Sequence, residues 1–213
     1  VVTAQNGSTN TYTFTITRAE SADATLSSLS LTSGSLSPSF NASTASYTAS
    51  IANTVTSITL TPTVNEPNAT VKVNGTNTIS GNASQAITMS VGSNTVTVVV
   101  TAQNGTTGTY TVTITRAQSS DATLSSLLLS SGSLSPSFSA STTSYTSSIA
   151  NTVTSITVTP IVNEANATVT VSGISTTSGN ASSGITMNIG SNTVTIVVTA
   201  QNGSTNTYTF TIT

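Results

Sequence analysis

The stretch "NTVTVVVTAQNGTTGTYTVTIT" at Asn94–Thr115 contains two runs in which apolar residues alternate with hydroxyl-bearing ones. A period of two places successive side chains on opposite faces of a strand and indicates a strand with one buried face. The Asn104-Gly105 pair between the runs tolerates the positive φ angles of a tight turn. The stretch therefore predicts a β-hairpin, whose inward side chains are Val96, Val98, Val100, Tyr110, Val112 and Ile114.

Most of this hairpin occurs three times in the 213 residues, at a spacing of 98 residues, and the first and last copies are identical. Without a gap, Arg18–Thr115 and Arg116–Thr213 are identical at 75 of 98 positions. This period has the size of a small domain. We therefore expect domains over 18–115 and 116–213, and we interpret 1–17 as the C-terminal hairpin of a preceding, incomplete repeat.

An isolated two-stranded hairpin is only marginally stable in water. Val1–Thr17 should therefore pack against further β-structure, and the sequence leaves two alternatives for where that structure lies. It completes its own domain within a longer chain, or it docks on a neighbouring molecule.

The rest of each repeat shows the same alternation in short runs. In the first repeat these runs are "TLSSLSLT", "SYTASIA", "SITLTPTV", "ATVKVNG" and "AITMSVG". Together with the hairpin they predict seven strands and no amphipathic helix. Short strands with one polar face predict tandem immunoglobulin-like, seven-stranded antiparallel β-sandwiches of Greek-key type, an all-β fold.

Proline and two large apolar residues refine this picture. Pro62 and its counterpart Pro160 cannot donate a ladder hydrogen bond, so their strand should lie at a sheet edge or end there. In "GSLSPSF", Leu36 and Phe40 should close the open end of the sandwich.

The segments "DATLSSLSLTSGSLSPSFNASTASYTASI", "NATVKVNG", "VGSNTVTVVVTAQNG" and "TYTVTITR" resemble the cadherin-like β-sandwich domain of bacterial surface proteins. The resemblance covers nearly all of both repeats. It implies tandem arrays in secreted or cell-surface proteins and no catalytic residues. The interdomain calcium motifs of true cadherins are not present.

Composition argues against several classes of function. There are 49 Thr and 39 Ser, but no His or Cys that could activate a hydroxyl nucleophile, so we expect no enzyme and no cofactor. Only three basic residues are present, which excludes a phosphate-binding groove for nucleic acid. The longest aliphatic runs are three residues, too short to insert into a membrane.

The acidic residues near the repeat boundaries are the only candidates for a metal site, and they are weak ones. Calcium requires six to eight oxygen ligands, whereas the first boundary offers Glu20 and Asp23 and the second offers only Asp121. We therefore predict no metal site. Both aspartates should instead pair with Arg18 and Arg116 or cap a turn before the first strand.

The sequence also contains candidate residues for two kinds of modification. Lys72 lies between inward Val71 and Val73 and should face solvent, and its counterpart is Thr170, so an isopeptide crosslink is not expected. Nine Asn-x-Ser/Thr sequons are close to the number expected by chance in so hydroxyl-rich a chain. These possible glycosylation sites are Asn6, Asn41, Asn68, Asn74, Asn82, Asn104, Asn166, Asn180 and Asn202.

These observations favour a non-enzymatic structural or adhesive repeat of an extracellular fibre, filament, sheath or large cell-surface protein. Its partners would be copies of itself or adjacent repeats, because the low charge leaves little repulsion between copies. The alternative is a surface module that orders water, binds ice or binds carbohydrate through outward threonines. On the last strand of the first repeat these are Thr109, Thr111, Thr113 and Thr115.

Overall fold

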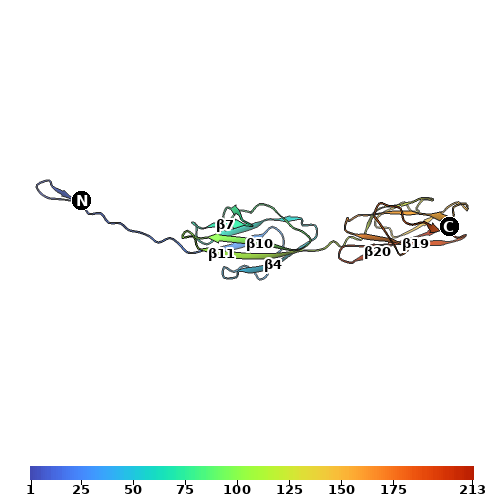
Figure 1. The fold of residues 1–213 in the computed structure, drawn as a ribbon, viewed down its shortest axis with the longest axis horizontal. Helices are drawn as coiled ribbons and strands as arrows, with labels where there is room; N and C mark the ends of the chain where they lie inside the picture. The colour runs from blue at the N-terminus through green and yellow to red at the C-terminus, as the bar shows by residue number, and fades with distance from the viewer. The chain divides into compact units, whose positions relative to one another are not determined.

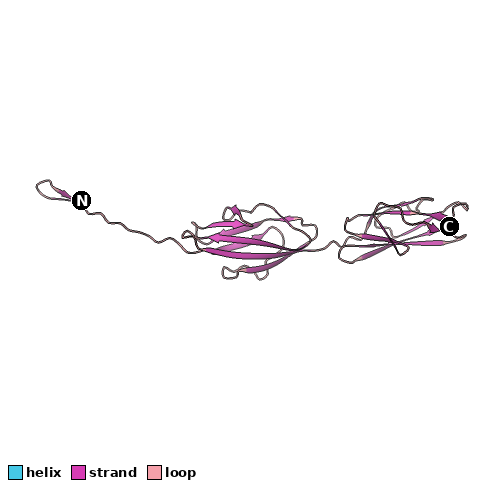
Figure 2. Ribbon diagram, in the orientation of Figure 1, coloured by secondary structure: helices cyan, strands magenta, loops and turns pink.

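The computed structural model describes all residues, 1–213, and divides the chain into two compact units, Val1–Arg116 and Ala117–Thr213. Every regular element is a strand, and there is no helix (Figure 2). Each unit contains one β-sandwich of nine strand segments, here called the first and the second sandwich.

The strands of the two sandwiches correspond one to one. Those of the first are β3 (Leu26–Leu31), β4 (Ser46–Ile51), β5 (Ser57–Ile58), β6 (Leu60–Val64), β7 (Thr70–Val73), β8 (Thr76–Thr78), β9 (Ile87–Thr88), β10 (Gly92–Thr101) and β11 (Thr107–Arg116). Those of the second are β12 (Leu124–Leu129), β13 (Ser144–Ser147), β14 (Ser155–Ile156), β15 (Val158–Val162), β16 (Thr168–Val171), β17 (Ile174–Thr176), β18 (Ile185–Thr186), β19 (Asn192–Thr199) and β20 (Thr205–Ile212).

One layer of the first sandwich is a five-stranded sheet in the order β4-β11-β10-β7-β8, and four of these strands are labelled in Figure 1. The opposite layer consists of two short ladders, β3-β6 and β5-β9. The second sandwich repeats this arrangement, with the five-stranded order β13-β20-β19-β16-β17.

The predicted hairpin is the centre of the large sheet. β10 and β11 pair over ten residues, with Val96 opposite Val112 and Val98 opposite Tyr110. All six side chains predicted to face inward are buried, and they form one cluster with Leu26, Leu29, Ile58 and Leu60 from the opposite layer. The alternation in the sequence therefore identified this part of the core correctly.

All seven predicted strands are present, but the run "SITLTPTV" forms two segments. β5 pairs with β9, whereas β6 pairs with β3, and Thr59 separates them. Pro62 lies in β6 opposite Leu29, and its carbonyl accepts a hydrogen bond from the Gly81 N–H at 2.8 Å. β6 has a single strand partner, as the proline predicted.

One strand pair departs from the antiparallel pattern. β4 runs parallel to β11, with Tyr47 opposite Val112 and Ile51 opposite Arg116. Hydrophobic alternation is the same for parallel and antiparallel neighbours, so the sequence pattern could not distinguish the two arrangements.

A short edge strand, β8, was not predicted. It follows β7 through a two-residue turn in which Asn74 has φ 47° and Gly75 has φ 79°. Two successive positive φ angles are those of a type I′ hairpin turn, for which Asn-Gly is the favoured sequence. In the second sandwich the same turn contains Ser172 at φ 47°, followed by Gly173.

Aromatic side chains close one end of each sandwich. Phe40 packs against the core together with Leu36, and its ring lies 6.0 Å from Tyr47 and 6.3 Å from Tyr110, centroid to centroid. Phe138, Tyr145 and Tyr208 repeat this cluster in the second sandwich. The expected role of Leu36 and Phe40 is therefore confirmed.

The hydroxyl group of Tyr110 joins two parts of the sandwich. It accepts a hydrogen bond from the Leu26 N–H at 3.0 Å and donates one to the Ala42 carbonyl at 2.9 Å. Tyr208 makes the same two bonds with Leu124 and Ala140, at 3.1 and 2.9 Å. The last strand of each sandwich is thereby linked to the start of the first.

We expect Tyr110→Phe to lower the free energy of unfolding of the first sandwich by about 1–3 kcal/mol. The change leaves a buried N–H and a carbonyl without their partner. Tyr12→Phe is the matched control, because Tyr12 occupies the equivalent position in Val1–Thr17 but is 62% exposed. Chemical denaturation of both variants measures the difference, and equal stabilities would contradict this role of the Tyr110 hydroxyl.

We expect Ser172→Asn to stabilise the second sandwich by about 0.5–1 kcal/mol. A left-handed backbone conformation is costly for most residues and is tolerated best by Gly, Asn and Asp. The reverse change, Asn74→Ser, should destabilise the first sandwich, where Asn74 Oδ1 also accepts a hydrogen bond from the Thr97 N–H at 2.9 Å. Thermal melting of both variants tests the pair, and a lower melting temperature for Ser172→Asn would refute the argument.

Candidate functional site

The outward face of the large sheet carries the threonines that the sequence suggested as a possible binding surface. On β11 the outward residues are Thr109, Thr111, Thr113 and Thr115, and all four side chains are exposed or half-buried. They face outward because their neighbours on the same strand, Tyr110, Val112 and Ile114, are buried in the core.

Strand register arranges the outward hydroxyl groups in rows across the sheet. Thr111 lies between Ser46 of β4 and Thr97 of β10, and Thr113 lies between Thr48 and Thr95. The next row is different, because Thr109 lies beside Val99, which pairs with Lys72. The face thus contains hydroxyl rows at one end and an aliphatic and a charged residue at the other.

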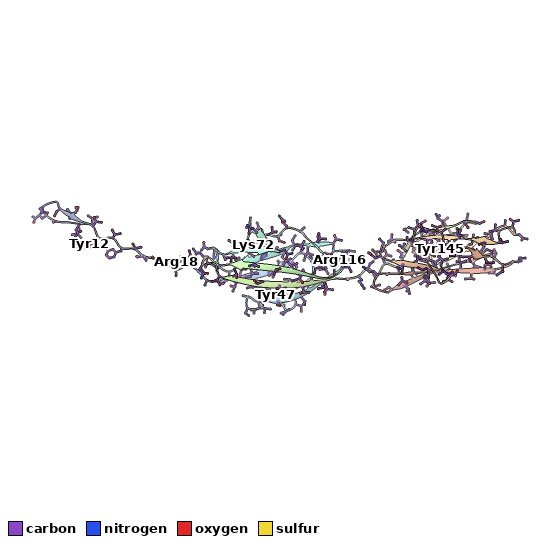
Figure 3. The ribbon with its side chains drawn as sticks, viewed as in Figure 1. Tyr12, Arg18, Tyr47, Lys72, Arg116 and Tyr145 are labelled. Atoms are coloured by element: carbon purple, nitrogen blue, oxygen red, sulfur yellow. The ribbon has the colours of Figure 1, made fainter.

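Lys72 is exposed on β7, as predicted (Figure 3). It pairs across the ladder with Asn77 of β8, the outermost strand on this side of the sheet. In the second sandwich the equivalent pair is Thr170 and Ser175. These two edge strands, β8 and β17, therefore contain no charged residue.

Each aspartate caps the chain just before the first strand of its sandwich. Asp23 Oδ1 accepts hydrogen bonds from the Thr25 N–H at 2.9 Å and the Thr25 hydroxyl at 2.6 Å, and Oδ2 accepts one from Asn65 at 2.7 Å. Asp121 repeats these bonds with Thr123 and Asn163. Of the two roles expected for the aspartates, the structure shows the turn cap.

These hydrogen bonds lower the pKa of both aspartates. For Asp23 the largest cause is the Thr25 hydroxyl, followed by Asn65, and for Asp121 the corresponding groups are Thr123 and Asn163. Glu20 is exposed, and the structure does not gather three acidic side chains at any point. The residues proposed as weak metal candidates are thus distributed along the chain, and the two aspartates have partners within their own sandwiches.

Arg116, at the boundary between the units, does not use an aspartate as its partner in these hydrogen bonds. Arg116 is the last residue of β11 and donates to the carbonyls of Asn53 and Met89 in the first sandwich. Arg18, at the equivalent position one repeat earlier, is exposed (Figure 3). No residue pattern indicated this role of Arg116, because both acceptors are main-chain atoms.

All nine sequon asparagines are exposed. Several of them stabilise turns, since the Oδ1 atoms of Asn6, Asn41, Asn104 and Asn202 each accept a hydrogen bond from the N–H two residues later. This is the Asx-turn, in which an Asn side chain bonds the backbone two residues further along the chain. Turn formation therefore provides a structural reason for four of the sequons.

We expect the free energy of unfolding to fall with decreasing pH in the acid range. A carboxyl group whose pKa is lower in the folded state stabilises the fold above its unfolded pKa, about 3.9. That contribution disappears as the pH falls through the lower, folded value. In Asp23→Asn/Asp121→Asn the melting temperature should vary less between about pH 5 and pH 2. An unchanged pH dependence would contradict the assignment.

Comparison with known proteins agrees with this architecture. The family model described as "Cadherin-like beta sandwich domain" matches residues 26–117 and 120–213. A protein of Evansella cellulosilytica named "Putative membrane protein" is 42% identical over 91 residues, which is 43% of this chain and 14% of that protein. The chain thus spans a small part of this relative. No helix here has the length and apolarity required to cross a membrane.

The solved structures that match this chain are more distant. "Protocadherin gammaB7 EC3-6 cis-dimer structure" has 16% identity and a TM-score of 0.36, over 80% of this chain and 46% of that one. "Crystal Structure of Mouse Cadherin-23 EC22-24" has 12% identity and a TM-score of 0.29, over 80% of this chain and 62% of that one. The family assignment rests on the family model, whose two matches include every strand of both sandwiches. The chain belongs to the family of cadherin-like β-sandwich domains, of which it contains two tandem copies.

Proposed function

We propose that this chain is a non-enzymatic structural repeat of an extracellular fibre, sheath or large cell-surface protein, and that its sandwiches self-associate. The observation that supports this proposal most is the repetition itself. Two sandwiches with the same strand order and register are built from sequences identical at 75 of 98 positions. A chain of nearly identical domains suits a role that depends on length and on regularly spaced surfaces.

The junction between the repeats is short. Arg116 is bound to the first sandwich, and Ser119 is bound to the second, where it accepts a hydrogen bond from the Asn202 N–H at 3.0 Å. Its own N–H donates to Gln201 at 3.2 Å. Two residues separate the anchored positions, which favours a tandem array over domains on long flexible linkers.

Self-association is supported by the edge strands. A sheet edge exposes unpaired N–H and C=O groups, and lysine, proline or inward charge normally prevents pairing with another molecule. β8 contains Thr76, Asn77 and Thr78, and β17 contains Ile174, Ser175 and Thr176, without any such residue. Ile174 is in addition 57% exposed. We propose that these edges are where copies meet.

We further propose that Val1–Thr17 is the last hairpin of a preceding repeat. Its seventeen residues are identical to Val197–Thr213, in which Tyr208, Phe210 and Ile212 are buried. The corresponding Tyr12, Phe14 and Ile16 are 62, 85 and 92% exposed. Such an apolar face is suited to the interior of a sandwich.

A location outside the cell or on its surface is consistent with the family and with the relative whose name describes a membrane protein. Exposed asparagines and hydroxyl groups are compatible with that environment.

We expect the chain to form regular oligomers or filaments at high concentration, and Asn77→Glu/Ser175→Lys to prevent this. The two changes place one charge on each edge strand, and the glutamate lies opposite Lys72, so the fold should tolerate it. Sedimentation velocity and electron microscopy measure the outcome.

The matched control is Thr113→Glu/Thr211→Lys, which adds the same charges on β11 and β20, interior strands of the sheets. This variant should still assemble. If the edge variant assembles equally well, the contact is not at β8 and β17. If the unmodified chain remains monomeric at high concentration, self-association is refuted and only the tandem-repeat role remains.

A further inference from the structure

The second sandwich has a pocket of about 390 Å³ at the end where β20 terminates. The residues lining it include Asn151, Val153, Met187, Gly190 and Thr213. One repeat earlier, the equivalents of Asn151 and Met187 are Asn53 and Met89, whose carbonyls bind the guanidinium group of Arg116. The pocket therefore corresponds to the arginine-binding position of the first sandwich.

The arginine in the first sandwich uses all three of its donor groups. Its Nε and one terminal nitrogen donate to the Asn53 carbonyl at 2.8 and 2.6 Å, and the other terminal nitrogen donates to the Met89 carbonyl at 2.9 Å. Arg116, labelled in Figure 3, also continues the ladder, where it lies opposite Gly92 of β10 and Ile51 of β4. The side chain thus joins the end of the last strand to two loops.

The walls of the pocket in the second sandwich are near copies of those in the first. "IANTVT" occurs at both 51–56 and 149–154, and "ITMSVGSN" at 87–94 becomes "ITMNIGSN" at 185–192. The Met187 N–H donates to the Thr154 carbonyl at 2.9 Å, as the Met89 N–H does to Thr56. Asn192 Nδ2 donates to the Asn188 carbonyl at 2.8 Å, as Asn94 does to Ser90. The same backbone geometry presents the same carbonyls.

We propose that this pocket is a guanidinium-binding site, and that its ligand is an arginine side chain placed directly after the last strand of the sandwich. The position is the one that Arg116 occupies after Thr115 and that Arg18 occupies after Thr17. The inference builds on the tandem-repeat role, since the ligand would be the first residue of a following repeat. It does not depend on self-association.

The chemistry of the site favours arginine over lysine. The acceptors are neutral main-chain carbonyls, and a planar guanidinium presents several donors in fixed directions, which can reach two loops at once. A lysine ammonium is a compact point charge with no such fork. Apolar side chains in the wall, Ile149 and Val153, are suited to contact the aliphatic part of the arginine.

The two sandwiches differ in the burial of apolar side chains at this end. Ile51 is buried, whereas its equivalent Ile149 is half-buried. Val91 is half-buried, whereas its equivalent Ile189 is fully exposed. The sandwich that holds the arginine thus has the better-covered core at this end.

The test extends the full chain by three residues after Thr213, either Arg-Ala-Gln, which copies Arg116–Gln118, or Lys-Ala-Gln. We expect the arginine extension to raise the melting temperature of the second sandwich by about 5 °C. Amide hydrogen exchange, followed by NMR, should slow at Ile149 and Met187, while the equivalent Ile51 and Met89 serve as internal controls. The Nε–H of the added arginine should also become protected from exchange.

The complementary variants change the first sandwich. Arg116→Lys should lower its melting temperature by a similar amount and speed exchange at Ile51, whereas Arg18→Lys should have no effect because Arg18 is exposed. Equal effects of the arginine and lysine extensions, or an Arg116→Lys variant as stable as the original, would overturn the proposal. These measurements use monomeric protein at low concentration, so their outcome does not depend on whether the chain self-associates.

Discussion

The pairing of the last two strands is the interaction on which each sandwich depends. β10 and β11 supply six buried side chains, occupy the middle of the large sheet and have β4 and β7 as outer neighbours. Because all apolar residues of both strands except Val99 lie on one face, the pair can bury that face only against the opposite layer. The start of the first strand, the loop that contains Ala42 and the loops that contain Asn53 and Met89 are all hydrogen-bonded to this hairpin.

Two polar side chains on β11 connect its ends to the rest of the sandwich. Near the start of the strand, the Tyr110 hydroxyl holds the N–H of Leu26 and the carbonyl of Ala42. At its end, Arg116 holds the carbonyls of Asn53 and Met89. Both side chains satisfy main-chain groups that hydrophobic packing alone would leave unpaired, and unpaired buried polar groups are costly. A chain with few charges thus uses one of its arginines for structure.

The sequence allowed most of the strands to be predicted, because alternation of residues such as Val96 and Val98 with threonine has a single structural interpretation. It did not predict that β4 is parallel to β11, because alternation is the same in both directions. It also missed β8, which contains Thr76, Asn77 and Thr78 and therefore has no apolar pattern. The carbonyl partners of Arg116 could not be predicted for a different reason. Every residue has a main-chain carbonyl, so no residue type in the sequence indicates which carbonyls bind the arginine.

Local and tertiary effects are separated most clearly by the identical seventeen-residue segments Val1–Thr17 and Val197–Thr213. In both copies the turn forms in the same register, with Val2 opposite Asn10 and Val198 opposite Asn206. This much the sequence determines by itself, through Asn-Gly and short-range hydrogen bonds. Beyond the turn, β20 continues to Ile212, whereas β2 ends at Asn10. Only the tertiary structure extends the strand, because burial of Tyr208, Phe210 and Ile212 requires an opposite layer and neighbouring strands.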